Sequence, residues 1–162
     1  MLTRIWFRYL VYALIFLLVS FIAFLKLNPP LEHGSIGSTE DKQSVIVALG
    51  NKSMLGSIHI TDVSINDDEV PSHVNVQISD TEKGFTLTDT HALLGETHHT
   101  QAFTSFSLGP DTSPLAAKTV AAATDPAPAT IYGLSIAEDT TISRIKVTYR
   151  YFGLIFSKTI HV

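Results

Sequence analysis

The sequence predicts an all-β protein, an antiparallel β-sandwich preceded by one N-terminal transmembrane helix. Two observations predict this class. A run of seventeen uncharged residues, 9–25, lies between Arg8 and Lys26, and beyond residue 43 the hydrophobic period becomes two, with turn residues at short intervals. Immunoglobulin-like packing is our specific hypothesis, although the chain has neither the cysteine pair nor the domain tryptophan of true immunoglobulin domains.

The N-terminal run has the length and composition of a membrane anchor. Residues 9–25 read YLVYALIFLLVSFIAFL, which as a helix covers about 26 Å. Trp6, Phe7 and Leu27 extend it toward the thickness of a bilayer core if the flanking basic side chains snorkel. We therefore expect a cytoplasmic N-terminus over 1–8 and a transmembrane anchor over 9–27.

The flanking charges predict the orientation of this anchor. Arg4 and Arg8 precede the apolar run and only Lys26 follows it, so the positive-inside bias places the C-terminal domain outside the cytoplasm. A cleaved signal peptide is the alternative. Its cleavage site would need small residues soon after the apolar run, and the nearest suitable triplet, residues 35–37, lies about ten residues beyond it.

Residues 28–43 read as a flexible linker, and residues 44–162 as the β-sandwich domain. Asn28-Pro29-Pro30 ends the helix, because proline lacks the amide that the next helical turn needs. The segment that follows is small and polar, with two glycines.

Short apolar or alternating runs predict the strands. The second run changes phase near Asp62, which indicates a bulge or a bend in the strand. The predicted strands are 44–49, 57–65, 73–79, 85–88, 101–108 and 131–136, with polar turns at 66–69 and 80–84. Between them, 115–123 could form a helical turn or a loose loop, and 125–129 is expected to be extended.

The C-terminal residues predict a hairpin of 142–151 with 154–162. With Phe152-Gly153 as the loop, Tyr151 faces Leu154, and apolar and polar side chains separate onto opposite faces. Lys158 and Ile155 are the two residues that break this pattern. The turn type stays open, since phenylalanine is poorly suited to the positive φ of a tight hairpin turn.

Composition excludes several classes of function. The chain has no cysteine, so it has no disulfide, thiolate metal site or cysteine nucleophile. Residues 31–162 carry 15 carboxylates against 8 lysines and arginines, and a net charge of −7 argues against nucleic acid as a partner. We find no catalytic, cofactor-binding or phosphate-binding motif, and we predict no enzyme and no cofactor.

Three groups of residues could bind a ligand or carry a modification, and each also has a simpler interpretation. His91, His98 and His99 could bind a metal, but their spacing matches no ligand pattern, and solvated histidines are the expected alternative. Asp67, Asp68 and Glu69 lack the spacing of a calcium loop and are expected to form a polar turn. Residues 51–53 have the form of a glycosylation sequon, but a three-residue pattern also occurs by chance.

The charge asymmetry of the domain gives a possible binding face. Residues 140–162 contain four basic residues and no acid, and Arg144, Lys146 and Arg150 project from one face of the predicted strand. This stripe could bind anionic lipid, an acidic envelope polymer or an acidic patch on a protein. The alternative is a solvated face whose bases pair with the domain's own acids.

We therefore expect a single-pass protein of the cell membrane whose extracytoplasmic domain is a non-catalytic binding or accessory module. Its helix contacts lipid, and its domain could contact a protein or an envelope polymer. Two alternatives remain open. One is a small subunit of a membrane complex that uses the helix as its interface, and the other is an extracytoplasmic metal-dependent enzyme that uses the histidines near residue 98.

Overall fold

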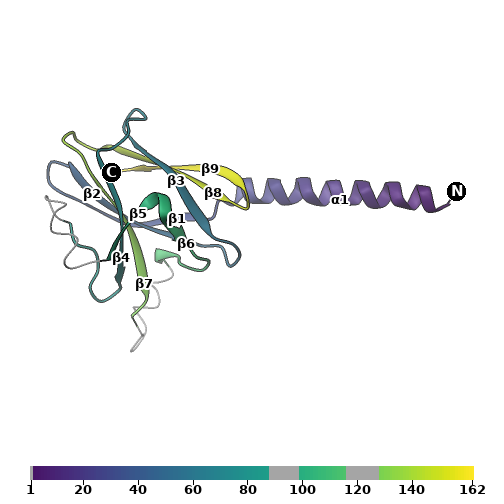
Figure 1. Cartoon of the computed structure of the whole chain (residues 1–162), viewed down its shortest axis with the longest axis horizontal. Coiled ribbons are helices and arrows are strands. Elements are labelled where there is room, and N and C mark those ends of the chain that lie inside the picture. The colour runs from purple at the N-terminus through teal and green to yellow at the C-terminus, as the bar shows by residue number, and fades with distance from the viewer. Residues whose placement is uncertain (1, 88–98, 116–127) are drawn as a thin grey trace. The chain divides into compact units, whose positions relative to one another are not determined.

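The computed structural model describes residues 2–87, 99–115 and 128–162, and it divides the chain into two compact units, Met1–Pro30 and Leu31–Val162 (Figure 1). The predictions for residues 88, 89–98 and 116–127, which include His91 and His98, lie outside the described residues.

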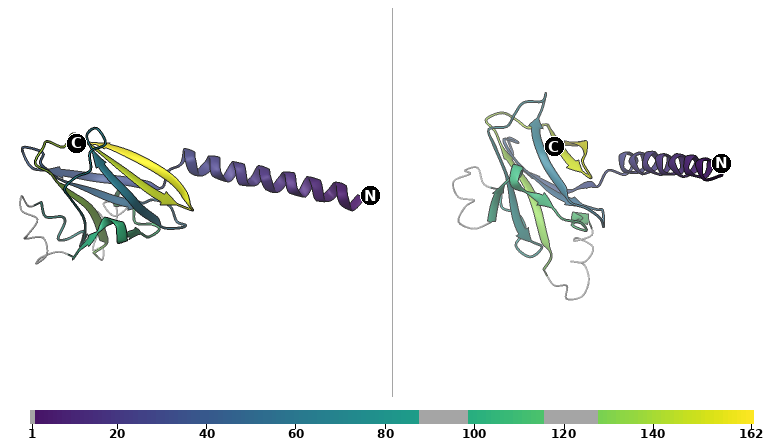
Figure 2. Two further views of the ribbon diagram at one scale, coloured as in Figure 1. Left: turned by 45° about the horizontal axis from the view of Figure 1, so that its top comes forward. Right: turned by 45° about the vertical axis from the view of Figure 1, so that its right-hand side comes forward.

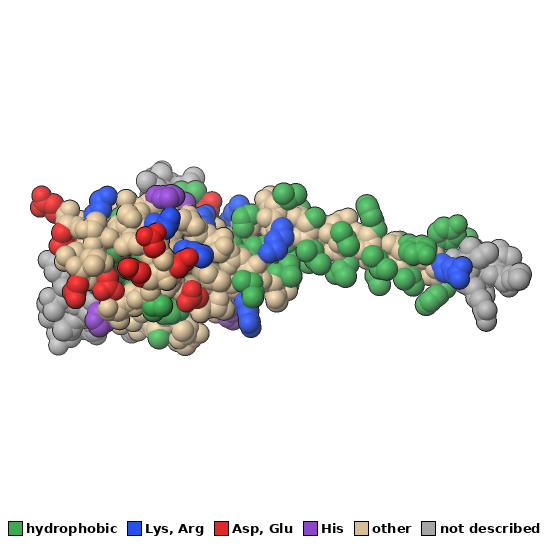
Figure 3. Space-filling view, turned by 90° about the horizontal axis from the view of Figure 1, so that it is seen from above, with side chains coloured by type: hydrophobic (Ala, Val, Ile, Leu, Met, Phe, Trp, Pro, Cys, Tyr) green, Lys and Arg blue, Asp and Glu red, His purple; other side chains and the backbone are tan. Residues whose placement is uncertain are grey.

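The first unit is helix α1, Leu2–Leu27. Within it, Trp6–Leu27 has a mean hydropathy of 2.6 over the most apolar part of its 22 residues, and is long and apolar enough to cross a membrane. Figure 3 shows apolar side chains along the helix, with no continuous polar face in that view. Asn28 closes the last turn, where its backbone and side-chain amides both donate to the Phe24 carbonyl, at 3.0 and 3.2 Å. The prediction of one N-terminal apolar helix is confirmed.

The second unit contains two antiparallel sheets (Figures 1 and 2). The five-stranded sheet has the order β1 (Leu31–Ser38), β2 (Ser44–Asn51), β7 (Thr130–Ala137), β4 (His73–Asp80) and β5 (His99–Ala102). The four-stranded sheet has the order β6 (Ser107–Leu108), β3 (Ile58–Ile65), β8 (Arg144–Tyr151) and β9 (Leu154–His161). The prediction of antiparallel β structure is confirmed, and the arrangement is sandwich-like.

Apolar side chains from both sheets form the core. On β8, alternate residues Ile145, Val147 and Tyr149 have no exposed surface, as expected for a strand with one covered face. Strand β2 is buried at every residue. Fully or almost fully buried side chains elsewhere include Ile58, Ile60, Val63, Ile65, Leu134, Ile136 and Ile160.

The predicted bulge near Asp62 is confirmed. Ile60 pairs with Tyr149 but Asp62 pairs with Thr148, so one residue of β3 is left over between them. The extra residue, Thr61, donates from its hydroxyl to the Thr148 carbonyl at 3.2 Å. Because of this extra residue, the next buried side chain after Ile60 is Val63 and not Asp62. This is the phase change visible in the sequence.

The terminal hairpin has the predicted register. Tyr151 pairs with Leu154 and Ile145 with Ile160, so the loop is the two residues Phe152 and Gly153. Both have positive φ, 47° and 76°, as in the primed turns that match strand twist. The Phe152 ring packs edge-on against Tyr151, with centroids 4.6 Å apart. This contact offsets part of the strain of a phenylalanine at positive φ.

The structure corrects the predicted flexible linker over 28–43. Residues Leu31–Ser38 form β1, an edge strand paired with β2, with an irregularity between His33 and Ile36. The polar, glycine-containing sequence concealed this strand because β1 is an edge strand and most of it is only partly buried. Gly34 allows a close approach rather than flexibility, since an added Cβ would lie 2.9 Å from Pro114.

Two predicted strands also need correction. Residues 101–108 do not form one strand, since a 3-10 turn at Phe103–Ser105 separates β5 in one sheet from β6 in the other. Residues 85–87 are irregular. There the Phe85 ring covers Gly133 so closely that an added Cβ would lie 2.8 Å from it. Aromatic and β-branched residues therefore signalled burial here, and not regular pairing.

Candidate functional site

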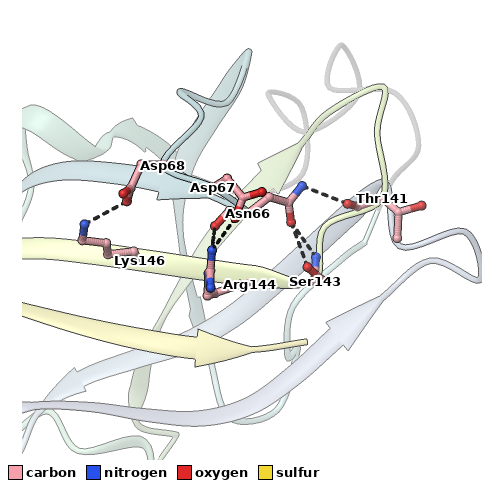
Figure 4. A network of polar contacts seen from close by, with 7 residues as sticks. All are labelled: Asn66, Asp67, Asp68, Thr141, Ser143, Arg144 and Lys146. Carbon is pink, nitrogen blue, oxygen red and sulfur yellow. Dashed lines mark hydrogen bonds and ion pairs between the residues drawn. The ribbon is translucent and has the colours of Figure 1, made fainter.

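The predicted basic stripe runs along the outward face of β8. Arg144 stands at its start, where its Nε donates to the Asn66 carbonyl at 2.8 Å and its Nη2 lies 2.9 Å from Asp67 Oδ1 (Figure 4). Lys146 Nζ lies 2.8 Å from Asp68 Oδ1. Arg150 is exposed near the other end of β8 and pairs with Ile155 in register.

Asn66 joins the acidic turn to β8 through several contacts. Its side-chain oxygen accepts from the Ser143 amide and hydroxyl, both at 3.0 Å, and its amide donates to the Thr141 carbonyl at 3.1 Å (Figure 4). Asn66 has a φ of 47°, a conformation that asparagine adopts more readily than most residues. The turn is therefore held by backbone and amide contacts, and the carboxylates of Asp67 and Asp68 are left to face the bases.

This geometry favours charge pairing within the domain for Arg144 and Lys146. Hydrogen bonding to Lys146, with its charge, holds the pKa of the Asp68 carboxyl below its ordinary value. The pairs are solvent-exposed, so they add little to stability. They do neutralise two of the three bases on this face. A role of the stripe in binding stays a prediction.

The other candidate residues do not gather into a site in the part of the chain that the structure describes. There, no three His, Asp or Glu side chains lie together as a metal would require. The backbone of His99 begins β5 and pairs with Ile78, and its side chain lies outside the described part of the structure. In the sequon, Asn51 is fully buried and its side-chain amide donates to the Gly56 carbonyl at 2.9 Å. The folded domain therefore shields the atom that a glycan would need.

Lys158, the first residue that breaks the hairpin pattern, joins the edges of the two sheets. It takes an inward position on edge strand β9, and its Nζ donates to the carbonyl of Leu31, on edge strand β1, at 3.1 Å. Burial lowers the pKa of Lys158, while Glu32 acts in the opposite direction. The half-buried His33 has its pKa lowered by burial and by the charge of Lys158. A charged residue at an inward edge position also disfavours pairing with a foreign strand.

Ile155, the second residue that breaks the pattern, belongs to a group of exposed apolar side chains at one end of the domain. Met54 and Leu55 lie in the β2–β3 loop, and Phe152 and Ile155 lie at the β8–β9 turn; all four are largely exposed. We call these four residues the apolar tip. The misplaced Ile155 was its only signal in the hairpin pattern, because a loop sequence such as 52–57 does not reveal which strand end it meets.

Tyr151 fixes the two loops of the apolar tip against each other. Its hydroxyl donates to the Leu55 carbonyl at 2.5 Å and lies 2.6 Å from Ser53 Oγ. Gly56 has a φ of 72°, and a Cβ there would lie 3.0 Å from the Phe152 ring. The loops therefore form one packed surface and are not independent of each other.

The fold and these surfaces define a class of protein with a single apolar helix followed by a two-sheet antiparallel β domain. Comparison with models of known protein families, with curated proteins and with solved structures found no match.

Proposed function

We propose that this chain is a single-pass membrane protein that displays a non-catalytic, immunoglobulin-like binding or accessory module on the extracytoplasmic side of the cell membrane. The observation that carries the proposal is the apolar segment Trp6–Leu27, joined directly to a folded β domain that begins at Leu31. An apolar helix of this length satisfies its own backbone hydrogen bonds and can therefore remain in lipid.

The basic residues support the proposed orientation. Arg4 and Arg8 lie before the apolar segment and Lys26 follows it, an asymmetry that favours a cytoplasmic N-terminus. The position of β1 supports a retained helix over a cleaved signal peptide. Cleavage near residues 35–37 would cut through β1 and remove Leu31, whose side chain is only 1% exposed.

The chain path supports an immunoglobulin-like arrangement within this proposal. The chain passes from β2 in one sheet to β3 in the other and back to β4, and later from β7 to β8. Such crossings between two antiparallel sheets are typical of Greek-key sandwiches. The packed sheets leave the loops and outer faces for contacts with a partner, and the helix raises the local concentration of the module at the membrane.

Cysteine labelling tests the orientation, because the natural chain has no cysteine to interfere. We propose Val70→Cys, at an exposed loop position of the domain, and Thr3→Cys before the apolar segment. A membrane-impermeant maleimide added to spheroplasts should label Val70→Cys at once and Thr3→Cys only after permeabilisation. The reverse pattern, or recovery of the unlabelled chain in the soluble fraction, would overturn the proposal.

A further inference from the structure

We propose that the apolar tip, Met54, Leu55, Phe152 and Ile155, inserts into the interface of the bilayer that α1 spans and so holds the β domain down on the membrane surface. This inference rests on the proposed function, because it needs the helix to cross that bilayer. It adds a second lipid contact, made by the domain itself.

The apolar tip exposes four large apolar side chains at one end of the domain. Met54 and Leu55 are 81% and 71% exposed, and Phe152 and Ile155 are 53% and 58% exposed. Single exposed apolar residues need no explanation, but a group on a loop and an adjoining hairpin indicates a surface that is covered in use. Phe152 also keeps an unfavourable positive φ in a turn that asparagine or glycine would fit better. Turn formation alone does not explain that choice of residue.

The chain connection limits how far this end of the domain can lie from the apolar segment. Leu31, the first residue of the domain, pairs with Asn51, which lies three residues before Met54. Lys158, four residues beyond Leu154 at the turn, donates to the Leu31 carbonyl. The four residue steps from Leu27 to Leu31 span at most about 14 Å. The end of α1 therefore cannot lie farther than that from the strand end that adjoins the apolar tip, whatever the orientation of the domain.

The charges at the two ends of the domain favour the same surface. The loops of the apolar tip, 52–57 and 152–153, contain one lysine and no carboxylate. Two carboxylates, Glu32 and Asp111, lie at the same end of the domain, where the Asp111 amide donates to the Ser53 carbonyl at 2.9 Å. The loops at the opposite strand ends are 39–43, 66–72 and 138–143, and they contain seven carboxylates: Glu40, Asp41, Asp67, Asp68, Glu69, Glu138 and Asp139. Anionic headgroups therefore repel the loops of the apolar tip less than they repel the acidic loops at the opposite strand ends.

Lipid is the occupant that these observations favour over a second protein. Apolar loop residues beside basic residues are the combination that interfacial binding uses. The short connection to α1 keeps this surface within reach of the bilayer that the proposed function requires. Burial of the tip against a second copy of the chain is a distinct outcome that the experiment below separates.

The test uses single cysteines in the full chain, each labelled with an environment-sensitive fluorophore and reconstituted in vesicles. The test positions are Met54→Cys and Ile155→Cys, and the matched control is Val70→Cys, an apolar position 82% exposed in the β3–β4 loop at the opposite strand ends. Ser20→Cys reports on the helix. The vesicles contain about three parts phosphatidylcholine to one part phosphatidylglycerol, with a nitroxide either near the headgroup or deep in the acyl chain.

We expect the shallow nitroxide to reduce emission at positions 54 and 155 by at least about twofold relative to position 70. We expect the deep nitroxide to quench position 20. If position 20 is quenched but 54 and 155 behave like 70, this inference is wrong while the proposed function survives. If position 20 is not quenched, the proposed function itself fails. A blue shift of the fluorophore emission at position 54 without nitroxide quenching would indicate a protein contact. That result would overturn the proposal of lipid insertion.

A charge variant supplies a second measurement. Leu55→Asp combined with Phe152→Asp should at least halve the quenching at position 155, because both carboxylates would have to enter the interface. Val70→Asp is the control and should leave the quenching at position 155 unchanged. Circular dichroism establishes that each variant is folded. Unchanged quenching in the folded double variant would overturn the proposal.

Discussion

The ammonium group of Lys158 donates a hydrogen bond of 3.1 Å to the carbonyl of Leu31, and this contact joins the edge strand of one sheet to that of the other. Leu31 is also the residue at which the chain enters the β domain. The interaction therefore secures the first strand beside the connection to the helix.

Lys158→Ala should lower the free energy of unfolding by about 1 kcal/mol, since it leaves the partly buried Leu31 carbonyl without this donor. Lys52→Ala removes an exposed lysine nearby and should change stability by less than about 0.5 kcal/mol. Urea unfolding of the full chain in detergent micelles, followed by circular dichroism, measures both. Equal effects would show that the Lys158 contact contributes nothing specific.

The hairpin supplies a matched pair of isoleucines for testing the core. Ile145 on β8 has no exposed surface, whereas Ile155 on β9 is 58% exposed. Ile145→Ala should cost about 3 kcal/mol because it removes buried methyl groups and leaves a cavity. Ile155→Ala should cost less than about 0.5 kcal/mol in the same micelles. Similar losses at the two positions would contradict the assignment of the covered face.

Alternation along a strand was the property that predicted most of this fold correctly. In the hairpin, apolar and polar residues separate so clearly that register and loop followed from the sequence, including the partner of Tyr151. The bulge near Asp62 was predicted for the same reason, because one extra residue reverses the alternation.

The elements that sequence reasoning missed are those whose burial depends on distant segments. Strand β1 lies at a sheet edge, and its Gly34 is explained only by Pro114, far along the chain. Asp67 and Asp68 gave no sign that they would meet Arg144 and Lys146, because the pairing needs β3 beside β8. Likewise, the apolar tip joins two loops separated by nearly 100 residues.

Lys146→Ala should raise the pKa of Asp68 toward its ordinary value, because hydrogen bonding to Lys146 is the largest cause of its lowering. Lys83→Ala is an informative comparison. The pKa of Asp80 is lowered chiefly by the backbone amide of Lys83, which the substitution keeps, so Asp80 should shift less. NMR titration of the aspartate carboxyl carbons measures both. A larger shift at Asp80 than at Asp68 would contradict the paired geometry of Figure 4.

The raised pKa of the buried Tyr149 predicts a loss of stability at alkaline pH. Burial raises the pKa of its hydroxyl from 10.0 to about 12. Between these values the unfolded chain releases the proton while the folded domain retains it, so the folded state binds more protons and stability falls as pH rises.

Tyr149→Phe has no such proton and should lose less stability between about pH 8 and about pH 11. The lowered pKa of Lys158 acts in the opposite direction, favouring stability as pH rises toward 10.5, but it is present in both proteins and cancels in the comparison. Urea unfolding at the two pH values, followed by circular dichroism, gives the difference. Parallel losses in the natural chain and the variant would show that the Tyr149 hydroxyl ionises as readily in the folded domain as in the unfolded chain.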